Sequence, residues 1–278
     1  HFFNCMNPRS HPENFTMYHE IGHGSQATVF SAYETQSETK VAIKVFPNDK
    51  KSLPSTLREI EVLRANKIKN LKHSLQLIRV KETSENLLVV IPLVKGVDLH
   101  YFVNETHGLS EKDAKPLFRN ILLAVQELHQ SGYCHLDLKL ENVMILENSN
   151  QVKLLDFGFA ERIFNPGQED VETLQTHFRG SVHYTCPQIG RHEPYHGTYA
   201  DIWALGVMLY TMIAMQFPFS SATGQVNEVL IKIQQRKVNF PLWFSPKLIE
   251  FINCMWDTNE KYTISQLLEH PWLTGTSL

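Results

Sequence analysis

The sequence has few cysteines, little net charge and no long apolar run, and each shortage argues against a class of protein. Four cysteines in 278 residues, with no Cys-x-x-Cys pair, give no sign of a disulfide-stapled fold or a zinc site. A net charge of −3 is untypical of nucleic-acid-binding proteins. The most apolar stretch, 203–219, is interrupted by Gln216 and Pro218 and is shorter than the roughly 20 residues of a membrane span. We therefore expect an intracellular, cytoplasmic protein, with a nuclear location left open, and neither a nucleic-acid partner nor a membrane span.

The overall amino-acid composition is typical of a soluble globular protein. Hydrophobic residues make up 42% of the chain and charged residues 20%. The 14 histidines are scattered without the spacing of metal ligands, so we interpret them as solvated or core residues. No internal repeat is found, and at about 150 residues per domain the length predicts one or two domains.

Hydrophobic periodicity divides the chain into a strand-rich first part and a helical second part. Strands are predicted over 27–34, 40–46, 75–80 and 86–93, with a helix that opens near Pro54. Helices are predicted from Ser110 to Gly132 and over 200–215, 226–235, 246–255 and 264–270. The pattern predicts an α+β fold with a small β-rich lobe, a larger helical lobe and a cleft between them. We place an N-terminal extension at 1–16 and the lobes at 17–94 and 95–278.

The first motif with chemical meaning is a glycine-rich segment at 22–29, Gly-His-Gly-Ser-Gln-Ala-Thr-Val. Gly22 and Gly24 allow the backbone to approach phosphates closely and to donate N–H groups to them. A dinucleotide fingerprint would join a strand to a helix. Here the residues after the glycines alternate like a strand, which disfavours a Rossmann dehydrogenase.

A lysine on the next strand suits a phosphate site. Ala42 and Lys44 lie on one face of the strand, because side chains alternate. A buried ammonium group needs a carboxylate partner, and the following helix offers Glu59 and Glu61. Glu59 shares its face with apolar residues three and four positions later, so helical geometry favours Glu59 as the inward partner.

A second group of polar residues lies at 134–142, Cys-His-Leu-Asp-Leu-Lys-Leu-Glu-Asn, before an apolar strand. Asp137 could accept a hydroxyl proton, Lys139 could steady a transferred phosphoryl group and Asn142 could ligate a metal. Cys134 beside the histidine could be taken for a thiol nucleophile, but adjacency in sequence is not a catalytic pairing. Asp156, in an Asp-Phe-Gly triplet after another strand, is a hard oxygen ligand that suits Mg²⁺.

These four motifs, in this order, resemble the eukaryotic protein kinases over about residues 17–273. Lys139, two residues after Asp137, is typical of the serine/threonine type. The loop 135–139 and the ending His-Pro-Trp-Leu at 270–273 are most similar to the calmodulin-dependent kinase branch. The resemblance implies Mg²⁺ with ATP as co-substrate and Ser/Thr residues of proteins as substrates.

The resemblance also implies roles for individual residues. Lys44, paired with Glu59, would hold phosphates; Asp137 would be the catalytic base, supported by Lys139 and Ser181; Asn142 and Asp156 would bind Mg²⁺. The remaining nucleotide contacts would come from Gly22, Gly24, Val29, Ala42, Ile91, Pro92, Val94, Asp98 and Met144. A hydrophobic spine would contain Leu63, Leu77, His135 and Phe157. The helix that begins its motif at Asp201 would anchor the catalytic loop.

The sequence departs from the kinase pattern at several places. Leu136 stands where an arginine usually receives an activation-segment phosphate, so we expect activity without that phosphorylation. Gln188 replaces the usual glutamate of Ala-Pro-Glu, and Lys261 the arginine that pairs with it, so we expect these two to pair. Thr211 replaces a glutamate of arginine-directed kinases. A preference for basic substrates therefore depends only on Asp98, Glu141 and the negative balance of the larger lobe.

The expected function is a Mg·ATP-dependent serine/threonine protein kinase. A pseudokinase or kinase-fold binding module is the alternative, and a small-molecule kinase of related fold is a further one. The chemically necessary side chains are all present, which favours the enzyme: Lys44, Glu59, Asp137, Asn142 and Asp156. A regulatory segment or calcium-sensor partner outside this chain is left open.

Overall fold

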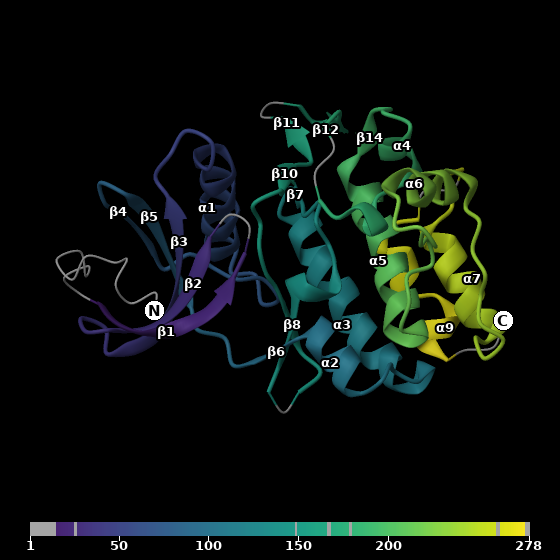
Figure 1. Ribbon diagram of the computed structural model, residues 1–278, viewed down its shortest axis with the longest axis horizontal. Coiled ribbons are helices and arrows are strands. Elements are labelled where there is room, and N and C mark those ends of the chain that lie inside the picture. The colour runs from purple at the N-terminus through teal and green to yellow at the C-terminus, as the bar shows by residue number, and fades with distance from the viewer. Residues whose placement is uncertain are drawn as a thin grey trace. The chain divides into compact units, whose positions relative to one another are not determined.

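The computed structural model describes residues 15–24, 27–147, 149–165, 168–177, 180–259 and 262–275, and it divides into two compact units (Figure 1). The first unit comprises residues 1–70 and 75–95, and the second comprises residues 71–74 and 96–278. Residues 1–14 of the expected N-terminal extension lie outside the described residues.

The first unit is an antiparallel sheet with one helix. The sheet has the strand order β1-β2-β3-β5-β4. Its strands are β1 (Phe15–His23), β2 (Thr28–Glu34), β3 (Thr39–Pro47), β4 (Arg79–Glu82) and β5 (Asn86–Pro92), and its helix is α1 (Leu53–Ile68). One face of the sheet buries an apolar cluster that includes Phe15, Ala32, Ile43 and Val90. The predicted helix near Pro54 is confirmed.

The predicted strand over 75–80 is wrong for residues 75–78, because β4 begins only at Arg79. Part of this backbone bonds to α1, and the N–H of Ile78 donates to the neighbouring strand β5, at 2.9 Å from the carbonyl of Val90. The N–H of Leu77 donates to the carbonyl of Leu63 at 3.0 Å, and Asn66 Nδ2 donates to the carbonyl of Leu75 at 3.0 Å. The strand β1 was not predicted at all, because two register shifts break the alternation of its side chains.

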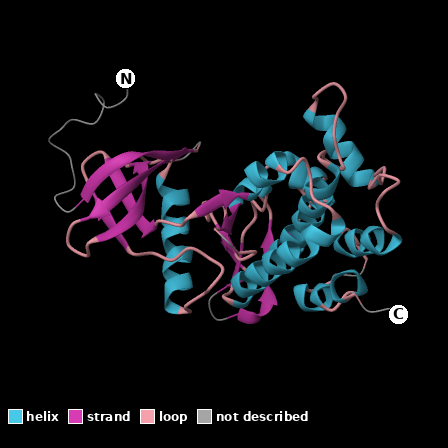
Figure 2. Ribbon diagram, turned by 90° about the horizontal axis from the view of Figure 1, so that it is seen from below, coloured by secondary structure: helices cyan, strands magenta, loops and turns pink. Residues whose placement is uncertain are grey.

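The second unit is mainly helical (Figure 2). Its helices are α2 (Leu99–Glu105), α3 (Glu111–Gln130), α4 (Pro187–Gly190), α5 (Gly197–Ala214), α6 (Val226–Gln235), α7 (Pro246–Met255), α8 (Ile264–Leu268) and α9 (Pro271–Thr274). Two short 3₁₀ turns are η3 (Leu140–Asn142) and η4 (Val182–Tyr184). Ser110 caps α3 as predicted, since its side chain accepts from the N–H of Asp113 at 3.2 Å. Gly132, with φ of 89°, follows the end of that helix.

Short strands of the second unit surround the polar loops. A three-stranded sheet has the order β6-β8-β9, with β6 (Gly96–Asp98), β8 (Val143–Leu146) and β9 (Val152–Leu154). Three antiparallel pairs follow: β7 (Tyr133–Cys134) with β10 (Glu161–Arg162), β11 (Phe164–Asn165) with β12 (Gln168–Glu172), and β13 (Leu174–Gln175) with β14 (Tyr195–His196). The loops after β7 and β9 carry the residues that the sequence marks for chemistry.

The apolar stretch 203–219 belongs to the core of the second unit. Helix α5 is buried along nearly its whole length. Trp203 stacks on Phe219 at 5.8 Å between ring centroids, and Trp256 Nε1 donates to the carbonyl of Trp203 at 3.2 Å. In the described part of the chain, no helix is long and apolar enough to cross a bilayer. The two units confirm the predicted α+β class.

Candidate active site

In the first unit, Lys44 and Glu59 form a buried ion pair. Lys44 Nζ lies 2.5 Å from Glu59 Oε1, and the two side chains are 12% and 3% exposed. The pair joins β3 to α1, as the apolar face of the helix predicts, while Glu61 is only partly buried. Two buried opposite charges need close contact to offset their desolvation, so the pair sets the position of the ammonium group.

The glycine-rich turn and the end of β5 are the other predicted nucleotide contacts of this unit. Gly22 lies opposite Val29 in the β1–β2 register, and the N–H of Gly24 donates to the carbonyl of Ala27 at 2.9 Å. This N–H is therefore used within the turn, and contact of Gly22 and Gly24 with a phosphate stays a prediction. Ser25 and Gln26 lie outside the described residues.

The predicted adenine contacts of the first unit continue on β3 and β5. Ala42 and Ile91 are register partners, and both are buried. Pro92 ends β5 and is exposed, and Val94 follows it with partial burial. Their contact with a nucleotide stays a prediction.

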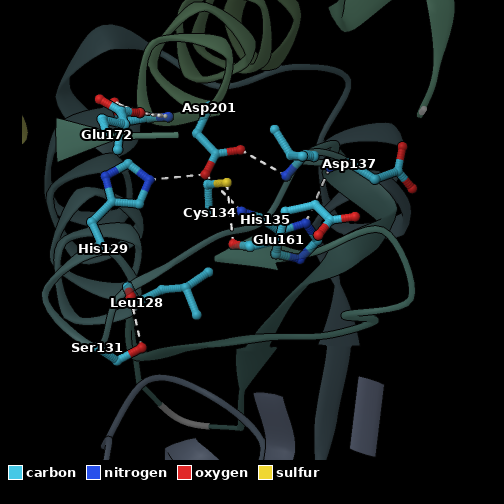
Figure 3. Close-up of polar contacts among 11 residues, drawn as sticks. Leu128, His129, Ser131, Cys134, His135, Asp137, Glu161, Glu172 and Asp201 are labelled. Atoms are coloured by element: carbon cyan, nitrogen blue, oxygen red, sulfur yellow. Dashed lines mark hydrogen bonds and ion pairs between the residues drawn. The ribbon is translucent and has the colours of Figure 1, made fainter. Parts of the chain in front are cut away.

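In the second unit, the carboxylate of Asp201 holds the loop after β7 (Figure 3). Its Oδ2 accepts from the N–H of His135 at 2.8 Å, and its Oδ1 accepts from the N–H of Leu136 at 2.8 Å. His129 Nε2 lies 2.8 Å from the same Oδ2. Two consecutive N–H groups thus point toward one carboxylate. The backbone of Leu136 is unusual at this place, because its φ is 62°. The anchoring role of Asp201 is confirmed, whereas the part of His129 was missed because nothing in the sequence links it to Asp201.

Asp137, Lys139 and Ser181 form one hydrogen-bonded group. Lys139 Nζ lies 2.9 Å from Asp137 Oδ2 and 3.3 Å from Ser181 Oγ, and Ser181 Oγ donates to Asp137 Oδ1 at 3.2 Å. Asp137 is buried, so its carboxylate is held in one orientation. This is the arrangement required for a general base beside a cation that neutralises developing charge.

Gly180 makes room for this group, and the sequence analysis did not single it out. Its φ is +97°. A Cβ at this position would lie 2.6 Å from the carbonyl oxygen of Leu136 and 3.1 Å from Asp137 Oδ1. Only glycine fits both the backbone angle and the space.

Asn142 and Asp156 fit the role of metal ligands. Asn142 Nδ2 donates to the carbonyl of Asp137 at 2.8 Å and to its Oδ2 at 3.1 Å. The amide nitrogen is thus directed at Asp137, which leaves the amide oxygen as the ligand atom. Asp156, with φ of 56°, follows β9, and its Oδ1 accepts from the N–H of Gly158 at 3.3 Å. Oxygen donors of an amide and a carboxylate suit a hard divalent cation. Across the described ranges, no three His, Cys, Asp or Glu residues form a separate metal cluster.

The residues of the predicted spine contact one another within each unit. His135 and Phe157 have ring centroids 5.4 Å apart. The ring nitrogens of His135 are both used, since Nδ1 accepts from the N–H of Asp137 at 3.3 Å and Nε2 donates to the carbonyl of Leu155 at 2.9 Å. In the first unit, Leu63 and Leu77 are linked by the backbone bond described above.

The thiol of Cys134 is no nucleophile. Burial raises its pKa well above the usual value, and the negative charge of Asp201 raises it further. Its Sγ donates to the carbonyl of Glu161 at 3.3 Å. Because the thiolate is the reactive form, this buried thiol is inert.

The remaining predicted residues have structural partners. Asp98 caps α2, since its Oδ1 accepts from the N–H of Tyr101 at 2.7 Å, and Met144 lies opposite Asp98 in the β6–β8 register. Gln188 lies in the first turn of α4. Its expected partner Lys261 lies outside the described residues, so that pairing stays a prediction.

Comparison with known proteins gives matches over nearly the whole chain. A family model described as Protein kinase domain matches residues 15–273. Maternal embryonic leucine zipper kinase of Xenopus laevis is 32% identical over 263 residues, which cover 93% of this chain and 39% of the relative. The same kinase of Danio rerio is 32% identical over 265 residues, covering 94% and 38%. Sperm motility kinase 3A of Mus musculus is 29% identical over 265 residues, covering 95% and 50%. The chain thus spans about half or less of the length of these relatives.

Proposed function

Because the chain belongs to the protein kinase domain family, we propose that it transfers the γ-phosphoryl group of Mg·ATP to serine and threonine hydroxyls of proteins. Its class is the serine/threonine type, related to the calmodulin-dependent kinase branch. The observation that carries the proposal is the group of Asp137, Lys139 and Ser181, with Asn142 bonded to the same aspartate. A binding module would have no need to hold these four side chains in one hydrogen-bonded arrangement.

In the proposed reaction, the substrate hydroxyl oxygen attacks the γ-phosphorus of ATP. The hydroxyl proton passes to Asp137, the bond from the γ-phosphorus to the bridging oxygen breaks, and ADP leaves. The ammonium of Lys139 offsets negative charge that develops on the phosphoryl oxygens. Asn142 and Asp156 would hold Mg²⁺, which neutralises phosphate charge when bound. The ammonium group of Lys44, positioned by Glu59, binds phosphate oxygens of ATP.

We further propose that this activity does not depend on phosphorylation of the activation segment. Leu136 carries no donor for a phosphate, and its side chain would touch a Cβ built on Gly197 at 3.5 Å. Of the nearby threonines, Thr176 is exposed and Thr173 is partly buried.

The substrate preference we propose is for serine or threonine within basic segments. Asp98 and Glu141 supply negative charge in the second unit, and Glu141 is exposed. Exposed carboxylates attract basic peptides over a distance of about 8 Å at physiological ionic strength.

The test uses bacterially expressed protein that is treated with phosphatase and checked by mass spectrometry. Incubated with Mg·ATP and a peptide library, the phosphatase-treated protein is expected to phosphorylate Ser/Thr peptides. It is expected to keep most of the specific activity that it has before phosphatase treatment. A tenfold loss that is recovered when Thr173 or Thr176 is phosphorylated again would contradict phosphorylation independence. Absence of transfer under both conditions would instead indicate the pseudokinase alternative.

A further inference from the structure

The segment 172–177 is bound to the beginning of α5 by several contacts. Strand β13 pairs with β14, with Leu174 opposite His196 and Gln175 opposite Tyr195. The hydroxyl of Tyr195 also donates to the carbonyl of His177 at 2.9 Å. This segment lies between the Asp-Phe-Gly triplet and Ser181, so its position bears directly on where a substrate hydroxyl can lie.

Glu172 makes the most polar of these contacts. Its Oε1 accepts from the N–H of Thr198 at 3.1 Å and from Thr198 Oγ1 at 2.8 Å. Its Oε2 lies 3.2 Å from His196 Nδ1. The N–H groups at the start of a helix lack partners within the helix, and a negative charge there is stabilised by the helix dipole. A carboxylate 26 residues earlier in the chain thus satisfies the first turn of α5.

The same turn of α5 also carries the catalytic loop. A Cβ on Gly197 would lie 2.3 Å from Cys134 Sγ, so the thiol packs directly on the helix start. Burial raises the pKa of the Cys134 thiol, and the negative charges of Asp201 and Glu172 raise it further. Four residues further along the helix, Asp201 holds the backbone of the loop that contains Asp137.

We propose that Glu172 is a positioning residue that docks the activation segment on α5 and replaces the phosphate that this segment would otherwise need. This inference rests on the proposed function above. A phosphate on the activation segment carries a charge of about −1.5 to −2, and it orders the segment by binding arginine side chains. Here Leu136 cannot serve as such a partner, and the carboxylate of Glu172 instead accepts from the backbone N–H and the hydroxyl of Thr198 beside His196.

A positioning role predicts an effect on turnover that an ordinary surface contact would not have. In Glu172→Ala, kcat for a peptide substrate is expected to fall about tenfold or more, because two hydrogen bonds to a charged acceptor are lost. KM for ATP is expected to stay within about twofold of the parent, because Thr198 and His196, which Glu172 contacts, are not among the predicted nucleotide or Mg²⁺ contacts. Glu172→Gln keeps an oxygen acceptor for Thr198 and is expected to recover part of the loss.

The matched control is Glu193→Ala. Glu193 is also a carboxylate near the start of α5, but it is exposed and forms an ion pair with the exposed Arg191 at 2.9 Å. Exposed pairs of this kind contribute little, so this variant is expected to have the kcat of the parent.

Hydrogen exchange of unphosphorylated protein gives a second measurement that needs no turnover. The peptide containing 172–177 is expected to exchange at least about tenfold faster in Glu172→Ala than in Glu193→Ala. If kcat and exchange in Glu172→Ala both match Glu193→Ala, the docking role is wrong. If the unphosphorylated parent is inactive, phosphorylation independence fails, while the exchange comparison still decides whether Glu172 docks the segment.

Discussion

Replacing Gly180 by alanine tests whether the space beside Asp137 is required for catalysis. The φ of +97° is unfavourable for any residue with a Cβ and costs roughly 1–3 kcal/mol. The added methyl group would also lie 2.6 Å from the carbonyl oxygen of Leu136 and 3.1 Å from Asp137 Oδ1. The first neighbour is backbone and cannot move alone, so the loop that carries the base must shift.

Gly132→Ala separates the backbone cost from this contact. Gly132 has φ of +89°, and a Cβ built on it has no neighbour within 4 Å. The two variants therefore share the torsional cost, which lowers the melting temperature by about 2–4 °C per kcal/mol for a chain of this size. Gly180→Ala carries the additional displacement of the catalytic loop.

The assay is steady-state phosphorylation of a peptide, together with thermal denaturation. Gly132→Ala is expected to melt earlier and to keep kcat within about twofold of the parent at a temperature well below melting. Gly180→Ala is expected to lose kcat by about tenfold to 100-fold, because an error of about 1 Å in a catalytic group has this effect. A Gly180→Ala protein with the kcat of Gly132→Ala would refute the assigned geometry around Asp137.

Three further substitutions test the site and its support. Asp137→Asn is expected to bind Mg·ATP almost as the parent does and to lose phosphotransfer by about 100-fold or more, since a general base contributes roughly 10²–10⁴; turnover within a few-fold of the parent would show that the base is wrongly assigned. Asp156→Asn is expected to weaken Mg·ATP binding as well as the rate, because it removes charge from a metal ligand, and titration with a fluorescent nucleotide would show whether affinity is instead unchanged. Gly197→Ala is expected to lower the melting temperature, because its Cβ would lie 2.3 Å from Cys134 Sγ, and adding Cys134→Ala should restore part of it; equal melting of the single and double variants would disprove that contact.

Several local features could be predicted from the sequence because they depend on neighbouring residues. The alternation of β3 places Lys44 with Ala42, and the apolar face of α1 places Glu59 inward, so the ion pair follows from two periodicities. Ser110 is a cap because a hydroxyl before an apolar periodic run accepts the first free N–H groups of a helix. The order of the four motifs along the chain is by itself enough to indicate the kinase family.

Tertiary structure decided the contacts between residues that are far apart in the chain. The stretch 75–78 has the composition of a strand, but Leu75 and Leu77 bond to α1, a partner that the neighbouring sequence does not indicate. Gly180 is required because its φ is positive and because the loop of Leu136 and Asp137 approaches it closely. Glu172 is one carboxylate among many in the sequence, and its place at the start of α5 exists only in the folded chain. Periodicity reports which face of an element is buried, whereas the partner on that face is determined by packing across the whole unit.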